Sequence, residues 1–189
     1  NIKKLHFLFA KNIKDIPNPG EYRDISKTFV YITGSDYPCP DYEKVPELMS
    51  ELVDWTNSMK GQLHPVERAA EFHRRFVYIH PFPDGNGRVA RLMMNMLLLQ
   101  DHYMPVLISP KERTSYIKKL ENGRNFPTDF DEFIAKLEVK QQLRFVKLLG
   151  IENIEQTTIN AAKKNRSEYN ISRNCMEGDM PPPARGCLP

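Results

Sequence analysis

The chain has 189 residues, 40% of them apolar and 27% charged, with a formal net charge of +3 at pH 7. This length suits one compact domain with at most a small appendage, and the balance of residues excludes a mainly disordered or membrane-embedded protein. Lys and Arg are spread among 24 acidic residues, so the sequence does not indicate a DNA partner, and any anion site must be local.

Cysteine usage and the lack of a targeting signal indicate the compartment. Cys39, Cys175 and Cys187 fit no metal or C-x-x-C spacing, which predicts free thiols in a reducing environment. No run approaches the ~18 apolar residues of a membrane span and no signal peptide opens the chain, so we expect a cytoplasmic protein without a membrane partner. Because the first residue is Asn rather than Met, we expect the sequence to be a fragment.

The first half of the chain predicts three helices and one flap. Apolar residues at helical intervals predict a helix over 2–13. β-Branched and aromatic residues before a Gly-Ser-Asp turn predict a short β-hairpin flap at about 27–36. Proline near the start and glycine at the end predict a helix over 45–61, and a further helix over 64–79 begins with His64 as its cap and Pro65 in its first turn.

The second half predicts three more helices and a tail. One helix begins within the stretch 80–91 and runs to Gln100, and proline-to-glycine segments predict helices over 109–123 and 127–150. The polar segment 151–189 ends in successive prolines, which remove backbone donors, so we expect a helical or disordered tail. The fold class predicted for residues 1–150 is therefore a mainly α helical bundle with a short β-hairpin flap.

The helix that ends at Gln100 is apolar around almost its whole circumference, which predicts that it is central and buried. Its apolar residues are Val89, Leu92, Met93, Met94, Met96, Leu97, Leu98 and Leu99. We interpret the three methionines as core filler. The polar residues Arg88, Arg91 and Asn95 share one side of the helix, and helical side chains lean toward the N-terminus. Both guanidinium groups should therefore approach the glycine-rich turn that precedes the helix.

This placement of the two arginines predicts an anion site. Cations three residues apart repel, and the start of a helix carries about half a positive charge, each effect amounting to some tenths of a kcal/mol. A bound polyphosphate would resolve the conflict, since Gly85 and Gly87 allow backbone N–H groups to turn inward beside the two arginines. We interpret the stretch as a phosphate-binding turn.

The residues around this turn suggest catalysis. Asp84 beside a polyphosphate is most simply explained by a bridging Mg²⁺, which binds one or two protein oxygens together with phosphate oxygens. His80 can take a proton from a hydroxyl near neutral pH. These groups are the parts needed to transfer a phosphorus centre from a nucleotide to a hydroxyl, although no Walker lysine and no G-x-G-x-x-G is present.

The stretch "HPFPDGNGRVAR", from His80 to Arg91, matches every specified position of the Fic family signature H-x-F-x-[D/E]-G-N-G-R-x-x-R. The segments "PGEYRD", "AAEFHRRFVYIHPF" and "RTSYIKKLENGRN" also resemble the corresponding Fic segments, so the resemblance extends from the first helix to about Gly150. It implies a nucleotidyltransferase that moves AMP from ATP to a Ser, Thr or Tyr hydroxyl of a target protein.

The resemblance also implies roles for individual residues. His80 would be the general base, Phe82 would anchor the loop in the core, and Asp84 would hold Mg²⁺. Further residues would bind the nucleotide: Gly85, Asn86 and Gly87 as an anion hole over the α- and β-phosphates, Arg88 and Arg91 on the β- and γ-phosphates, and Tyr116 and Leu120 at the adenine. The family often has two tyrosines where this chain has Tyr116 followed by Ile117.

Partners and regulation follow from the same resemblance. A target protein would dock on the flap at about Thr28–Thr33 by strand pairing. Many relatives carry an inhibitory helix, [S/T]-x-x-x-E-[G/N], whose glutamate pairs with the second motif arginine. The nearest stretch here, from Ser172 to Glu177, has one residue too many. We therefore expect that helix upstream or in a separate protein, and Arg91 unopposed. Assembly into a homo-oligomer stays open.

Other functions stay open at this point. Gly87 favours AMP transfer over phosphate transfer, while UMP or another donor, or removal of AMP, is compatible with the same residues. A metal-dependent hydrolase could use His64, His73, His80 and Asp84, although no H-E-x-x-H pair is present; we interpret His73 as a core histidine instead. A non-catalytic binding module, such as a DNA-binding regulator that begins near 151–165, is the second alternative.

Overall fold

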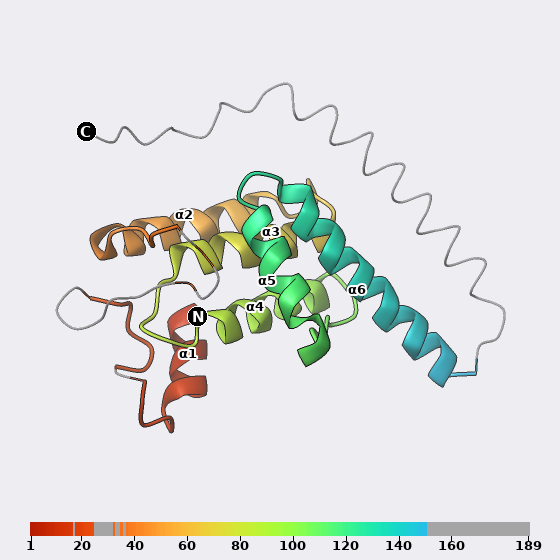
Figure 1. Cartoon of the computed structure of the whole chain (residues 1–189), viewed down its shortest axis with the longest axis horizontal. Helices are drawn as coiled ribbons and strands as arrows, with labels where there is room; N and C mark the ends of the chain where they lie inside the picture. Colours follow the sequence, from red (N-terminus) through yellow and green to blue (C-terminus); the bar gives the residue numbers. More distant parts are fainter. Residues whose placement is uncertain (17, 25–31, 33–34, 36, 151–189) are drawn as a thin grey trace. The chain divides into compact units, whose positions relative to one another are not determined.

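In a computed structural model of the chain, the described residues are 1–16, 18–24, 32, 35 and 37–150 (Figure 1). The chain divides into two units, Asn1–Gln142 and Leu143–Pro189, and the candidate site lies in the first. Most of the predicted flap and all of the predicted tail lie outside the described residues. The β-hairpin and the boundary at residue 150 therefore stay predictions.

The described residues form six α-helices and no strand, in agreement with the mainly α prediction. The helices are α1 (Ile2–Ala10), α2 (Val45–Ser58), α3 (Pro65–Ile79), α4 (Asn86–Gln100), α5 (Arg113–Asn122) and α6 (Pro127–Leu148), and short 3₁₀ turns, Tyr42–Lys44 and Pro110–Glu112, precede α2 and α5. Proline lies in the first turn of α2 and α3, where its missing N–H has no intrahelical role. The first helix ends three residues before the predicted residue 13.

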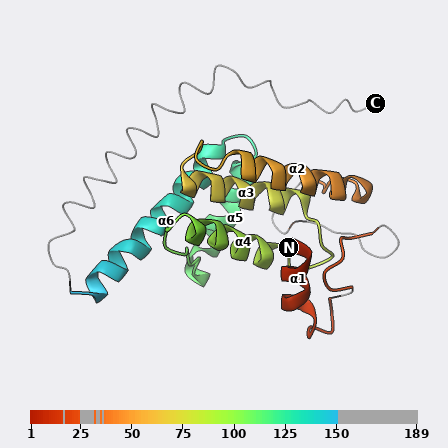
Figure 2. The same cartoon turned by 180° about the vertical axis from the view of Figure 1, so that it is seen from behind.

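The central helix of the first unit is α3. It packs against α2 on one side and α4 on the other, and α1 contacts α4 (Figures 1 and 2). Two of every three α3 residues are buried, including Phe72 and Phe76, whose rings stack with centroids 5.9 Å apart. The prediction of His64 as the cap is confirmed, because its Nδ1 accepts a hydrogen bond from the N–H of Val66. The motif thus begins at the C-terminal end of the central helix.

The predicted burial of α4 is only partly right. Val89, Ala90, Met94, Leu97 and Leu98 are buried against its neighbours. On another face, however, the residues Leu92, Met96 and Leu99 are 44%, 44% and 55% exposed. A helix that is apolar all round gives no sequence signal for which face its neighbours cover, and here part of it stays in water. The interpretation of Met96 as core filler is wrong, whereas Met94 fills the core as expected.

The described part of the chain contains no helix with both the length and the apolar character that a bilayer crossing requires.

Candidate active site

A cleft of about 650 Å³ opens beside the start of α4, which is within the usual size of a small-molecule site. The nine residues that the sequence predicts as site residues all line it: His80, Asp84, Gly85, Asn86, Gly87, Arg88, Arg91, Tyr116 and Leu120. They come from the α3–α4 loop, from α4 and from α5. The structure therefore brings all nine predicted residues to one cleft.

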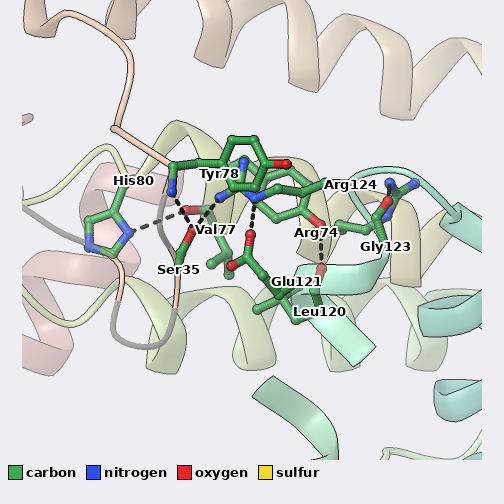
Figure 3. A network of polar contacts seen from close by, with 10 residues as sticks. Ser35, Arg74, Val77, Tyr78, His80, Leu120, Glu121, Gly123 and Arg124 are labelled. Carbon is green, nitrogen blue, oxygen red and sulfur yellow. Dashed lines mark hydrogen bonds and ion pairs between the residues drawn. The ribbon is translucent and has the colours of Figure 1, made fainter. Parts of the chain in front are cut away.

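His80 ends α3 in an unusual backbone conformation. Its φ and ψ are 52° and 58°, the left-handed region that side chains other than glycine rarely adopt. Its Nδ1 lies 3.2 Å from the carbonyl oxygen of Val77 (Figure 3). Because a carbonyl only accepts, Nδ1 must carry the proton, and the other ring nitrogen, Nε2, keeps its lone pair. The imidazole is thus held in the tautomer that can accept a proton.

The surroundings of His80 keep it neutral. Burial lowers the pKa of His80 from its ordinary value of 6.5, and the positive charge of Arg23 acts in the same direction. The hydrogen bond to Val77 and the carboxylate of Asp84 raise the pKa but act more weakly than burial. At neutral pH the ring therefore has an unprotonated Nε2 available to a substrate.

The loop after His80 is fixed by Phe82 and Asn86. Phe82 is fully buried, as predicted. The side-chain amide of Asn86 accepts from the N–H of Phe82 at 2.9 Å and donates to its carbonyl at 2.7 Å. The oxygen and one N–H of this amide are thus used inside the loop, which fixes the orientation of the Asn86 side chain. Its side chain is a structural brace.

His6 also braces the loop, and the sequence analysis did not find it. Its ring stacks on Phe82 with centroids 3.9 Å apart. Its Nδ1 accepts from the N–H of Gly20 at 2.8 Å, which leaves the proton on Nε2, where it donates to the carbonyl of Asp84 at 3.1 Å. His6 therefore joins α1 and the turn at Gly20 to the loop that carries the predicted metal ligand.

The two glycines leave space around the start of α4. Gly85 has a φ of +81°, and a Cβ there would lie 2.8 Å from the ring of Phe9. A Cβ on Gly87 would lie 3.4 Å from the Arg91 guanidinium. The first N–H groups of a helix have no intrahelical acceptor, and those of α4 begin at Asn86 beside Arg91. The arrangement is suited to binding an anion.

The positive charge of Arg88 has two partners that the sequence analysis did not predict, Asp84 and Phe9. Its guanidinium lies 3.1 Å from the Asp84 carboxylate and 4.5 Å above the centre of the Phe9 ring. The sequence analysis assumed that the positive charge at the start of α4 has no partner within the protein. In the structure the Asp84 carboxylate offsets part of it. Arg88 and Asp84 are both about half exposed, and such pairs contribute less than about 1 kcal/mol. An anionic ligand can therefore compete with Asp84 for Arg88.

The residues fit a magnesium ion held through a single carboxylate. Asp84 lies on the cleft wall, and its carboxylate is largely exposed. Among the residues that the structure describes, no three His, Cys, Asp or Glu side chains gather as a closed metal site. Mg²⁺ commonly takes one or two protein carboxylates together with phosphate oxygens and waters. The same finding gives no support to a hydrolase built on His64 and His73.

The part of the cleft wall formed by α5 includes apolar side chains. Tyr116 and Leu120 are both buried there. The sequence analysis did not predict several other lining residues, among them Ile32, Val77, Ile108, Arg113, Ile117 and Glu121. Behind this wall Tyr78 donates to the carbonyl of Leu120, and Arg124 lies 4.0 Å above the Tyr78 ring (Figure 3). A flat, apolar group such as a nucleobase suits this part of the cleft.

The interpretation of His73 as a core histidine is confirmed. It is fully buried, and its Nε2 lies 3.2 Å from the hydroxyl of Tyr116. Burial lowers the pKa of His73 to about 3. The ordinary pKa of histidine is 6.5. Between pH 6.5 and about 3, His73 therefore binds a proton in the unfolded chain but not in the folded chain.

Acidification should therefore destabilise the fold through His73. We expect the free energy of unfolding to fall between pH 6.5 and about 3, by at most about 1.4 kcal/mol per pH unit from this residue. Urea unfolding at about pH 7, 6 and 5 measures the slope in the unchanged protein and in His73→Gln, which cannot titrate. The variant should lose less stability on acidification, and parallel curves would contradict the assignment.

The sequence and the fold both match known proteins. The Fic/DOC family model matches residues 1–98, just over half of the chain. The protein adenylyltransferase Fic of Drosophila willistoni is 45% identical over 139 residues, which cover 71% of this chain and 26% of that protein. The protein adenylyltransferase fic-1 of Caenorhabditis briggsae is 30% identical over 168 residues, 85% of this chain and 32% of that protein. The chain thus spans about a quarter to a third of the length of these relatives.

Solved structures show the same fold. A fragment of Fic-1 from C. elegans superposes with a TM-score of 0.69 at 28% identity, covering 80% of this chain and 44% of that one. A Fic-domain signalling protein from Bacteroides thetaiotaomicron gives a TM-score of 0.58 at 32% identity, covering 86% of this chain and 62% of that one. The helical arrangement around the cleft is therefore shared with proteins of this type.

Proposed function

The chain belongs to the Fic/DOC family, and from this premise we propose that it is a protein adenylyltransferase, which transfers AMP from Mg-ATP to a hydroxyl side chain of a target protein. The relatives from Drosophila willistoni and Caenorhabditis briggsae are named protein adenylyltransferases, and such enzymes imply the use of ATP. One observation carries the proposal: the free Nε2 of His80 shares a cleft with the start of α4 and Arg91. A base and an anion site are thus within reach of one nucleotide.

In this mechanism His80 acts as the general base. Its Nε2 takes the proton of the target hydroxyl as the hydroxyl oxygen attacks the α-phosphorus of ATP. The bond from that phosphorus to the oxygen bridging the α- and β-phosphates breaks, so the products are the AMP-modified protein and pyrophosphate. The proton on His80 then passes to solvent. Neutral imidazole is required at the start, which the lowered pKa of His80 supports.

The other lining residues would bind and orient the nucleotide. Main-chain N–H groups at Asn86 and Gly87 would face the α- and β-phosphates, and that of Gly85 would do so on leaving Asp84 Oδ1, to which it donates in the structure. Arg88 and Arg91 would hold the β- and γ-phosphates. Asp84 would hold Mg²⁺, which supplies neutralisation of phosphate charge when bound. Tyr116 and Leu120 would enclose the adenine.

The target protein would bind through the segment at about Thr28–Thr33, most of which lies outside the described residues. Strand pairing along that segment would align the target hydroxyl with His80. Two further parts of the proposal are an inhibitory helix in an upstream segment or a separate protein, and a cytoplasmic location. The inhibitory helix extends what the resemblance implies, and the cytoplasmic location extends what the cysteine pattern indicates.

The position of the transferred label tests the proposal. The protein is incubated with Mg²⁺, candidate target proteins and ATP labelled at either the α- or the γ-phosphate. We expect protein-bound label from α-labelled ATP and none from γ-labelled ATP, because the α-phosphate travels with AMP. Label from the γ position would indicate phosphate transfer and contradict the proposal. Stronger labelling from α-labelled UTP would contradict ATP as the donor.

A further inference from the structure

We propose that Arg23 is a positioning residue for the general base, because its guanidinium holds the end of α3, and with it His80, against the chain at Pro40. This inference depends on the proposed role of His80. Arg23 lies 57 residues before His80 in the sequence, and it is not among the residues that line the cleft.

Arg23 forms hydrogen bonds with the last residue of α3 and with the two residues that follow it. Its Nε donates to the carbonyl of His80 at 2.8 Å, and its Nη2 lies 3.4 Å from the carbonyl of Ile79. Its own main-chain N–H donates to the carbonyl of Pro81 at 2.8 Å. Three successive carbonyls at the end of α3 are thus bound by one residue.

The same guanidinium also binds a second part of the chain. Its Nη2 donates to the carbonyl of Pro40. Arg23 and Pro40 flank the stretch in which the sequence predicts the flap. The guanidinium of Arg23 therefore joins the carbonyl of Pro40 to the carbonyl of His80.

The end of α3 needs such a partner for two physical reasons. The last carbonyls of a helix have no intrahelical donor, and α3 has no basic side chain in its own last turn. A cation at this end also interacts favourably with the helix dipole. In addition, the left-handed conformation of His80 is strained, so the surrounding structure has to hold it in place.

The conformation enforced by Arg23 determines where the imidazole lies. With this backbone Nδ1 lies 3.2 Å from the carbonyl of Val77, a contact that fixes the tautomer with a free Nε2. If Arg23 is removed, His80 can relax toward ordinary backbone conformations and the ring loses this bond. The phosphate-binding residues at Arg88 and Arg91 do not contact Arg23, so nucleotide binding should be spared.

An arginine suits this position better than a lysine. The planar guanidinium donates from several nitrogens in fixed directions, and here Nε and Nη2 serve different carbonyls. A lysine at this position keeps the charge but donates from one nitrogen. Arg23→Lys should therefore keep the favourable charge at the end of α3 and lose part of the alignment.

The experiment compares Arg23→Ala and Arg23→Lys with Arg75→Ala, which removes an arginine from the exposed side of α3. We expect kcat for AMP transfer to fall about 10- to 100-fold in Arg23→Ala and less in Arg23→Lys, with the affinity for ATP within about twofold of the unchanged protein. Arg75→Ala should match the unchanged protein. Ethylguanidinium added to Arg23→Ala should restore part of the lost rate.

The state of the His80 ring provides a readout that does not depend on transfer. In ¹⁵N-histidine NMR spectra, assigned by comparison with His80→Ala, the unchanged protein should show His80 as the neutral Nδ1–H tautomer. Arg23→Ala should show a mixture of tautomers in a variant that still unfolds cooperatively, and Arg23→Lys tests the same point if Arg23→Ala does not fold. An unchanged His80 signal in a folded variant would overturn the inference. If the unchanged protein transferred no AMP while the His80 signal still changed in Arg23→Ala, the inference would be supported and the proposed function refuted.

Discussion

Replacing His80 with alanine is expected to lower the rate of AMP transfer by about 10²- to 10⁴-fold while leaving ATP affinity within about twofold. The substitution removes the only described lining group whose unprotonated nitrogen is fixed by a hydrogen bond on the other side of its ring. It leaves the start of α4 and both motif arginines in place. Transfer of α-labelled AMP gives the rate, and calorimetric titration with ATP gives the affinity.

The pH dependence of the unchanged protein provides a second check on His80. Because burial lowers its pKa below 6.5, the base stays unprotonated as the pH falls through 6.5, and activity should be lost only at a lower pH. The substitution His102→Asn is a matched control, since His102 is exposed, lies outside the cleft and has a φ of +64° that asparagine tolerates. Near-normal transfer by His80→Ala, or lost transfer by His102→Asn, would show that the base is misassigned.

The sequence predicted the helices and the site well where the signal is local. Proline at the start and glycine at the end marked α2, and the boundaries of α3 and α4 follow from His64 and the glycine-rich turn. The nine predicted site residues meet at one cleft because most of them belong to one continuous stretch. Such a stretch folds as a loop and the first turns of a helix, so spacing alone brings its residues together.

Contacts between distant segments could not be predicted in the same way. His6 and Asp84 are 78 residues apart, and nothing in the local pattern of either indicates a bond between them. Arg23 is likewise remote from His80, at a separation of 57 residues. The buried face of α4 was also mispredicted at Leu92 and Met96, because the neighbours of an all-round apolar helix decide which side is covered. These features depend on tertiary packing, which a single sequence does not display.

Replacing Arg88 with alanine is expected to weaken ATP binding about 10- to 100-fold. Its guanidinium stands at the start of α4, where phosphate oxygens would bind, and a charge-assisted hydrogen bond contributes about 1.5–3 kcal/mol. The variant also leaves the Asp84 carboxylate without its arginine beside the phosphates. Calorimetric titration with Mg-ATP measures the change, and higher salt should reduce the difference between the two proteins.

Arg75→Ala provides a closely matched control for this result. Both arginines pair with a carboxylate four residues earlier, Arg88 with Asp84 and Arg75 with Glu71, and their side chains are 45% and 43% exposed. Each also covers an aromatic ring, at 4.5 Å for Phe9 and 4.2 Å for Trp55. The two substitutions thus each remove one positive charge, one ion pair and one ring contact, but Arg88 lines the cleft and Arg75 does not. If both weakened ATP binding equally, the effect would come from net charge, and the start of α4 would lose its assigned role as the phosphate site.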